Sequence, residues 1–181
     1  KFQLLADEPC TDVYTLPLFS KRFCNAAVKK LRTRRDWTTN RHESYPTNDL
    51  LLQDLDEGFE KLYDQILHNI IEPAVNDLYG CKIGNFDHES FVVRYTPEVQ
   101  AHLDMHHDDA SFTAVVALSD PADYEGGETV FVKQKHTMRL RAGDVCLHPS
   151  MFSHKHGVRP VLSGDRYVIV SFCRVAWPPL P

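Results

Sequence analysis

Hydrophobic residues recur at three- and four-residue steps through DLDEGFEKLYDQILHNIIEPAVNDLYG, residues 54–80. This spacing puts them on one face of an α-helix, which begins with acidic residues and ends at Gly80. Pro73 has no backbone N–H to donate, so we expect the helix to kink or divide there. A shorter helix is predicted over SKRFCNAAVKKLRTR, residues 20–34, with Ser20 as its N-cap.

From about residue 88 the pattern changes to short runs that are rich in β-branched and aromatic residues. The runs are SFVVRY, FTAVVALS, ETVFV, TMRLR, DVCLHP and RYVIVSF, and turn signals such as EGG, RAGD and LSGD separate them. Short strands broken by turns indicate a sandwich or barrel of jelly-roll type. Helices followed by strands predict an α+β domain.

The length of 181 residues fits one domain with its own core. Within a domain over residues 1–181, we expect helical support over about residues 1–87 and a β core over about 88–175. The chain begins at Lys1 rather than Met, and we expect it to be a fragment of a longer chain. A net charge of −5 disfavours a nucleic-acid partner. No apolar run reaches the roughly 20 residues of a transmembrane segment, and no signal-peptide pattern is seen.

The five cysteines are widely spaced and form no C-x-x-C pair, which excludes a zinc knuckle and a thioredoxin-like motif. Cys146 and Cys173 lie in apolar runs, and we interpret them as core thiols. Cys10 and Cys24 flank a short segment, and a disulfide between them depends on the redox state of the compartment. The sequence leaves that pairing open.

The densest group of metal-binding side chains is MHHDDASFT, residues 105–113. In an extended chain, side chains two residues apart share a face, so His106 can converge with Asp108, and His107 with Asp109. Either pair is a candidate for holding a cation. A third ligand must come from elsewhere, and HPSMFSHKHGVRP offers His148, His154 and His156.

Two histidines and one carboxylate are typical of non-haem Fe(II) oxygenases, although a catalytic zinc also accepts three protein ligands. Arg166 favours iron, because it follows His156 by ten residues, beyond a turn at Ser163 and Gly164, and opens the next predicted strand. A hairpin of that length can return Arg166 toward the metal, where its guanidinium would pair with the distal carboxylate of a keto-acid cosubstrate. A zinc hydrolase has no particular need of this arginine.

These residues also carry a family resemblance. The H-x-D motif, followed some fifty residues later by a histidine and then, ten positions after it, by an arginine, resembles the 2-oxoglutarate and Fe(II)-dependent dioxygenases. The motifs CTDVYTLPLFS, FVVRYTPE, HHDDASFTAVVAL, DYEGGETVF, HPSMFSHKHG and RYVIVSF are similar, in order and spacing, to the C-terminal catalytic domain of procollagen lysyl hydroxylases. The resemblance covers nearly the whole chain. It implies an α+β fold with a double-stranded β-helix core, jelly-roll and cupin-like, and N-terminal supporting helices.

Carried over by motif position, the resemblance implies that His106, Asp108 and His156 bind iron. It also implies that Arg166 binds the 2-oxoglutarate carboxylate and that the Tyr95 hydroxyl contacts this cosubstrate. The three ligands and Arg166 are therefore the predicted catalytic residues.

The same motif positions disfavour His107 and Asp109 as ligands. We interpret these two residues and His154 as supporting or flanking the site, because ligating imidazoles need an acceptor for their other N–H. His148 precedes Pro149 and is interpreted as a strand-end histidine.

Three positions depart from the family pattern. Val115 stands where the family's F-T-x-N has asparagine, which would remove one polar contact to the cosubstrate. EGGET replaces three consecutive glycines, and Gly157 replaces the acid that follows the distal histidine. These differences bear on the substrate more than on the iron chemistry.

The resemblance predicts an oxidoreductase, a dioxygenase that hydroxylates peptidyl lysine in collagen-like polypeptides and releases succinate and CO2. It further implies Fe(II), 2-oxoglutarate and L-ascorbate as cofactors, the endoplasmic reticulum lumen as compartment, and a homodimer. Two alternatives stay open. One is the same chemistry on peptidyl proline or a small molecule, and the other is a catalytically silent module for dimerisation or docking.

Overall fold

The computed structural model describes residues 1–42, 44–84 and 86–175. Its centre is a seven-stranded antiparallel sheet with the order β1-β2-β10-β6-β13-β4-β3. The strands of this large sheet are β1 (Asp7–Cys10), β2 (Val13–Pro17), β3 (Asp49–Leu51), β4 (Phe86–Tyr95), β6 (Phe112–Ala117), β10 (Asp144–Pro149) and β13 (Arg166–Val175).

A smaller antiparallel sheet has the order β5-β11-β8-β9, and β12 forms a separate pair with β7. These strands are β5 (Leu103–His106), β7 (Tyr124–Gly126), β8 (Thr129–Phe131), β9 (His136–Met138), β11 (His156–Val158) and β12 (Val161–Gly164). The predicted β-rich second half is confirmed. Two antiparallel sheets with a cavity between them form the jelly-roll arrangement.

Both faces of the large sheet are apolar, and β13 shows how. Its side chains alternate between the faces, as in any strand. Tyr167, Ile169 and Cys173 pack into the core beneath the helices. Val168 belongs to a second apolar cluster, which Val170 joins from its edge, on the side of the smaller sheet. One face therefore carries the helical layer and the other lines the cavity.

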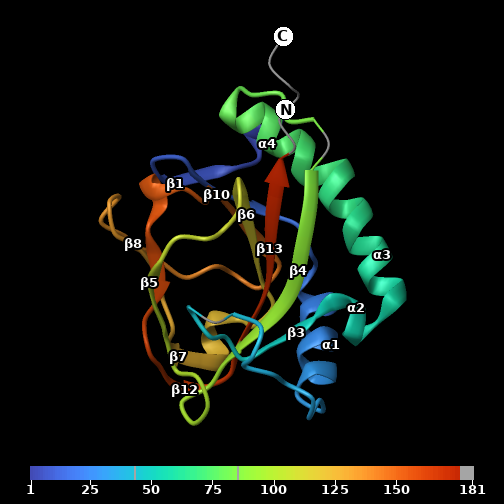
Figure 1. Ribbon diagram of the computed structural model, residues 1–181, viewed down its shortest axis with the longest axis vertical. Coiled ribbons are helices and arrows are strands. Elements are labelled where there is room, and N and C mark those ends of the chain that lie inside the picture. The colour runs from blue at the N-terminus through green and yellow to red at the C-terminus, as the bar shows by residue number, and fades with distance from the viewer. Residues whose placement is uncertain (43, 85, 176–181) are drawn as a thin grey trace.

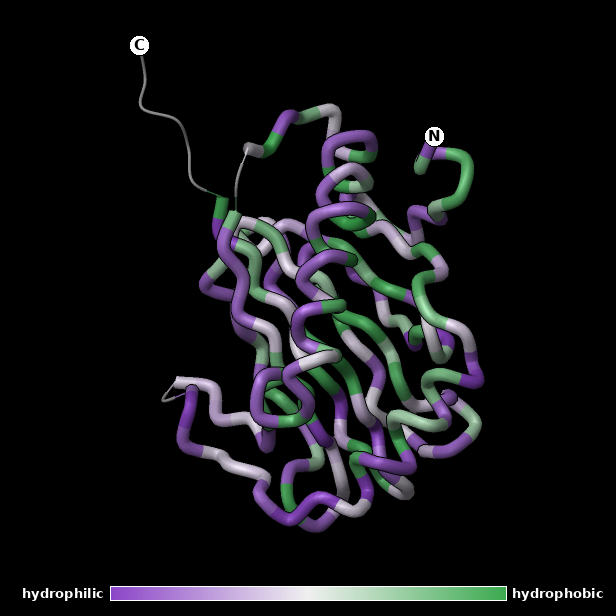
Figure 2. Tube along the Cα trace, turned by 90° about the vertical axis from the view of Figure 1, so that its right-hand side faces the viewer, coloured by the Kyte–Doolittle hydropathy of each residue, from purple (hydrophilic) through white to green (hydrophobic). Residues whose placement is uncertain are grey.

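The helical layer is α1 (Lys21–Leu31), α2 (Leu52–Leu55), α3 (Glu57–Ile66), the π-helical turn η2 (Leu67–Ile71) and α4 (Glu72–Tyr79). Helix α3 lies beyond β4, on the opposite side of the molecule from β5 and β8, and α4 lies at the top of the view near the upper ends of β13 and β4 (Figure 1). A view turned by 90° shows hydrophobic stretches in the strands behind the helices (Figure 2). None of the described helices is long and apolar enough to cross a membrane.

Both predicted helices are confirmed, with one refinement. The side chain of Ser20 accepts a hydrogen bond from the Phe23 N–H at 3.2 Å, and Gly80 ends α4 in a left-handed conformation. The helix divides near Pro73 through the π-turn η2, and Pro73 lies in the first turn of α4. That position suits proline, because a first-turn N–H has no partner within its own helix.

The segment predicted as helical support also supplies β1, β2 and β3 to the large sheet. These strands have four, five and three residues. Runs this short show no periodic pattern, and their pairing partners, β10 and β4, lie far along the chain. Three short 3-10 turns complete the described elements, namely η1 (Phe2–Leu4), η3 (Pro121–Asp123) and η4 (Phe152–His154).

All five cysteines are free thiols, so Cys10 and Cys24 form no disulfide in this structure. Cys24 is buried, with its Sγ 3.9 Å from the backbone carbonyl oxygen of Ala117. Cys173 is buried in the core beneath the helices and Cys146 in a third apolar cluster with Val13 and Phe131, as predicted for core thiols.

Candidate metal centre

Antiparallel pairing of β5 with β11 sets His106 directly opposite His156. Asp108 follows two residues after His106, just beyond the end of β5. All three side chains belong to residues that are 7% exposed. One potential ligand atom from each lies within 4.8 Å of the other two. Strand pairing therefore brings the His156 imidazole to His106 and Asp108, which lie far from it in sequence.

Backbone carbonyls orient both imidazoles. Nδ1 of His106 donates to the carbonyl oxygen of Asp104 at 2.7 Å, and Nδ1 of His156 donates to that of His154 at 3.0 Å. A carbonyl only accepts, so each Nδ1 carries its hydrogen and Nε2 is the nitrogen available to a cation. These two nitrogens lie 3.1 and 3.7 Å from the carboxylate oxygens of Asp108.

The Asp108 carboxylate and the neighbouring imidazoles change one another's pKa values. Burial raises the pKa of Asp108, but the charge of His156 and the hydrogen bond from His106 outweigh burial and lower it below the ordinary value. Burial lowers the pKa of His106, and the Asp108 carboxylate raises it by more. Asp108 therefore favours a positive charge at His106 Nε2, a position that a proton or a divalent cation can take.

The neighbouring residues His107 and Asp109 also line the cavity, but neither belongs to the cluster of three potential ligands. His107 is half-buried, and its ring packs 5.4 Å from that of Phe152. Asp109 is exposed, with one carboxylate oxygen 3.6 Å from Arg174. Both ring nitrogens of His154 are engaged elsewhere, with the Ser153 hydroxyl and the Thr11 carbonyl.

His148 lies closer to the centre than its sequence position indicated. It is on β10, as expected of a strand-end histidine, but it also lines the cavity. Its Nε2 is 4.0 Å from the Asp108 carboxylate, and its ring lies 4.7 Å from that of His156. Burial, reinforced by the charge of His156, lowers the pKa of His148 to about 3, so this imidazole is neutral.

Arg166 is the first residue of β13 and pairs in register with Tyr95, the last residue of β4. Its guanidinium lies 5.0 Å from the Tyr95 ring centre, and Nη2 donates to the Thr129 hydroxyl at 3.3 Å. Nη1 is buried and has no hydrogen-bond partner among the described residues. A buried unpartnered guanidinium N–H is costly, and a carboxylate is its strongest complement. Burial raises the pKa of Tyr95 to about 12, which keeps its hydroxyl protonated.

The path from His156 to Arg166 is not the simple hairpin that the sequence suggested. Strand β12 lies between them and pairs with β7, while β11 and β13 belong to different sheets. Arg166 still opens a strand as predicted. The ten-position step from His156 to Arg166 therefore corresponds to a crossing between the two sheets of the sandwich.

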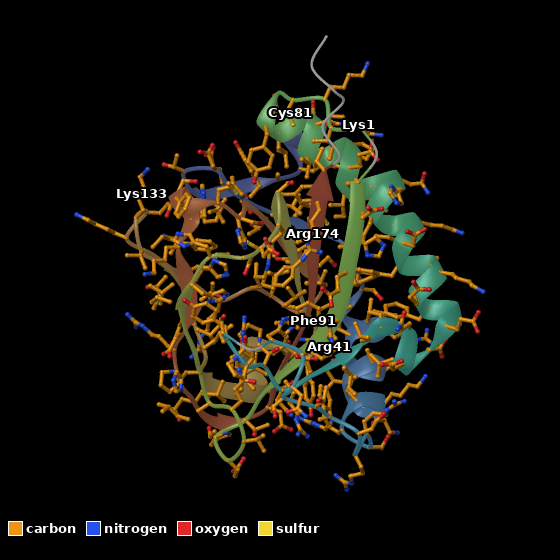
Figure 3. All side chains as sticks on the ribbon, in the orientation of Figure 1. Lys1, Arg41, Cys81, Phe91, Lys133 and Arg174 are labelled. Carbon is orange, nitrogen blue, oxygen red and sulfur yellow. The ribbon has the colours of Figure 1, made fainter. Side chains whose placement is uncertain are left out.

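All of these groups line one cavity of about 340 Å³ between the sheets. The loop before β3 contributes Arg41 and His42 to its wall, which sequence analysis missed because loop residues carry no periodic signal. The Arg41 guanidinium lies 5.0 Å from the ring centre of Phe91 (Figure 3) and pairs with Asp49 at 2.8 Å. Val115 also lines the cavity, and it offers no polar group there.

Comparison with known proteins agrees with this geometry. Residues 90–174 match the model of the 2OG-Fe(II) oxygenase superfamily. The chain is 33% identical to a multifunctional procollagen lysine hydroxylase and glycosyltransferase of Rattus norvegicus. It is 31% identical to procollagen-lysine,2-oxoglutarate 5-dioxygenase 2 of Mus musculus. Each alignment covers 93% of this chain and 24% of the relative, so the chain spans about a quarter of their length.

Solved structures share the fold. A viral collagen prolyl hydroxylase from Paramecium Bursaria Chlorella virus-1, in complex with 2OG, superposes with a TM-score of 0.65 at 18% identity, covering 92% of this chain and 97% of that chain. A Pseudomonas putida prolyl-4-hydroxylase gives a TM-score of 0.66 at 18% identity, covering 92% and 94%. These likenesses confirm the predicted α+β fold with a double-stranded β-helix core.

Proposed function

We propose that the chain is a 2OG-Fe(II) oxygenase, the superfamily whose model residues 90–174 match, and that it hydroxylates peptidyl lysine in collagen-like polypeptides, releasing succinate and CO2. The observation that carries the proposal is one cavity lined by His106, Asp108, His156 and the buried guanidinium of Arg166. Such a cavity can hold a metal and an anionic cosubstrate side by side.

The donor set of the centre fits Fe(II). His106, Asp108 and His156 would hold it through two imidazole nitrogens and one carboxylate oxygen, a ligand set that leaves positions open. When bound, Fe(II) supplies the activation of dioxygen, which no amino-acid side chain performs. The backbone carbonyls of Asp104 and His154 keep each imidazole in the tautomer that this role requires.

Arg166 and Tyr95 are the groups that would bind 2-oxoglutarate. The free Nη1 of Arg166 can donate to the distal carboxylate, while Thr129 holds Nη2 in place. The Tyr95 hydroxyl, kept protonated by burial, can donate a second hydrogen bond. Apolar side chains such as Val93, Val168 and Phe131 line the same cavity and exclude water from it.

Lysine as the target is supported by the names of the relatives, which are procollagen lysine hydroxylases at 31–33% identity. The resemblance also supports L-ascorbate as a reductant, the endoplasmic reticulum lumen as compartment and a homodimer as parts of the proposal. Arg166 favours the oxygenase over a zinc hydrolase, because only a keto-acid cosubstrate needs a guanidinium at that position.

The proposal is tested by turnover with Fe(II), 2-oxoglutarate and a collagen-like lysyl peptide, alongside a matched peptide in which proline replaces the lysine. We expect succinate release coupled to the gain of one oxygen on the lysyl peptide, and neither with Asp108→Ala. Asp109→Ala is the matched control and should retain turnover. If only the prolyl peptide gains oxygen, the target is peptidyl proline rather than peptidyl lysine. Absence of succinate with every peptide would favour a silent module.

A further inference from the structure

A buried hydroxyl group, that of Thr113, hydrogen-bonds to the Asp108 carboxylate, and a second buried hydroxyl, that of Ser150, hydrogen-bonds to Thr113. Thr113 Oγ1 lies 2.6 Å from Asp108 Oδ2 and 2.7 Å from Ser150 Oγ. Thr113 and Ser150 are each 1% exposed. The ionised carboxylate accepts only, so the single hydroxyl hydrogen of Thr113 goes to Asp108. Ser150 must then donate to Thr113, and the chain of hydrogen bonds runs in one direction, from Ser150 through Thr113 to Asp108.

Paired strands hold both hydroxyl-bearing residues in place. Thr113 is the second residue of β6 and pairs with His148 of β10. Ser150 directly follows the last residue of β10, and its backbone N–H donates to the carbonyl of Ser111 at 3.3 Å. A carboxylate hydrogen-bonded to Thr113 on the central strand β6, which Ser150 supports in turn, is held more firmly than its own position in the loop after β5 would allow.

The two oxygens of Asp108 are therefore not equivalent. Oδ2 accepts the Thr113 hydrogen bond and lies 3.7 Å from His156 Nε2. Oδ1 lies 3.1 Å from His106 Nε2 and accepts no hydroxyl hydrogen bond from the described residues. A carboxylate free to turn about its Cβ–Cγ bond can present one or both oxygens to a cation. A hydrogen bond to an ionised oxygen is strong, and turning the group would break it.

We propose that Thr113, supported by Ser150, is a positioning residue that makes Asp108 bind the metal through Oδ1 alone. This inference rests on the proposed function, because it requires a metal between His106, Asp108 and His156. Binding through one oxygen determines how many coordination positions of the metal stay open. A second carboxylate oxygen on the metal would occupy a position that the cosubstrate or dioxygen needs.

The test uses Co(II) alone as the probe, without cosubstrate, on the whole chain. Thr113→Val keeps the branched shape and removes the hydroxyl. We expect its Co(II) affinity, measured by calorimetry, to fall about 10- to 100-fold, as for other groups that orient metal ligands. We also expect weaker visible absorption per bound Co(II), which signals a higher coordination number. Thr113→Ser should restore both properties, and Ser150→Ala should change both in the same direction by less.

Ser119→Ala is the matched control, since Ser119 is a buried hydroxyl that bonds to Asp165 and Tyr167 rather than to the centre. It should bind Co(II) like the parent, whatever it does to the thermal stability of the metal-free protein. Parental affinity and absorption in Thr113→Val, or in Ser150→Ala if the first variant does not fold, would overturn the inference and leave the proposed function standing. A parent chain that binds no Co(II) would overturn both.

Discussion

Two carboxylates follow His106, but only Asp108 is buried in the ligand cluster, and this difference decides which carboxylate can reach a metal. Asp108 is 7% exposed and faces the imidazoles, whereas Asp109 is exposed and lies near Arg174. We predict that Asp108→Ala abolishes Fe(II) binding, measured anaerobically by calorimetry, while Asp109→Ala retains most of it. Equal losses in the two variants would contradict this assignment.

Arg166 makes a second prediction at the residue scale. Replacement by Lys keeps the positive charge but removes the forked donor whose Nη1 has no partner. Losing one hydrogen bond to a charged group costs about 1.5–3 kcal/mol, so the 2-oxoglutarate affinity should weaken roughly 10- to 100-fold. Calorimetric titration measures it. Fe(II) binding should stay at the parental level, and an unchanged affinity for 2-oxoglutarate would show that Arg166 is not its anchor.

At the scale of elements, a buried network of side-chain hydrogen bonds joins helix α3 to the large sheet. The Tyr63 hydroxyl lies 3.0 Å from that of Ser171, which accepts from Ser90 at 2.9 Å. His88 continues the chain, from Ser90 to Asp64 on α3. Ser171 is completely buried in this network.

This hydrogen-bond network gives a prediction about stability. Tyr63→Phe removes one hydroxyl from the network, and we expect the free energy of unfolding in urea to fall by about 1 kcal/mol. Leu62→Ala, on the exposed side of α3, is the control and should change it by less than about 0.5 kcal/mol beyond helix propensity. Metal affinity should not change in Tyr63→Phe, because the network lies on the helix side of the sheet.

The EGGET turn explains why glycine stands at the end of β7. Gly126 has a φ of +77°, and a Cβ there would lie 2.0 Å from the carbonyl oxygen of Pro160. We predict that Gly126→Ala lowers the free energy of unfolding by at least the roughly 1–3 kcal/mol of such backbone strain. Gly84→Ala is the control, since no atom lies within 4 Å of its Cβ position and its φ is not positive. Comparable losses at both glycines would argue against strain as the cause.

At the scale of the whole molecule, metal binding is coupled to folding, because the binding site lies in the cavity between the sheets. The three ligands come from strand β5, the loop after it and strand β11, and they meet only when the smaller sheet has formed. A ligand that binds only the folded state at 100 times its Kd adds about 2.7 kcal/mol to the free energy of unfolding. We predict that saturating Mn(II) raises the thermal midpoint of the parent and leaves that of Asp108→Ala unchanged. A rise in both proteins would place the binding elsewhere.

Local periodicity in the sequence determined the elements that are long enough to show it. The helical stretch around Pro73 was predictable because its apolar residues repeat every three to four positions over several turns. The separation of His106 and Asp108 from His107 and Asp109 was predictable because a strand alternates its side chains. The spacing from His156 to Arg166 placed the arginine at the start of β13.

Only the tertiary structure decided which distant segments meet. The pairing of β5 with β11, which joins His106 to His156, depends on how both sheets pack over the whole chain, and no local pattern encodes it. The same holds for β1, β2 and β3, which are too short to show a period. His148 and Arg41 joined the cavity wall for that reason as well. Periodicity records which face of its own element a side chain occupies, whereas the neighbours across that face are chosen by the packing of the complete chain.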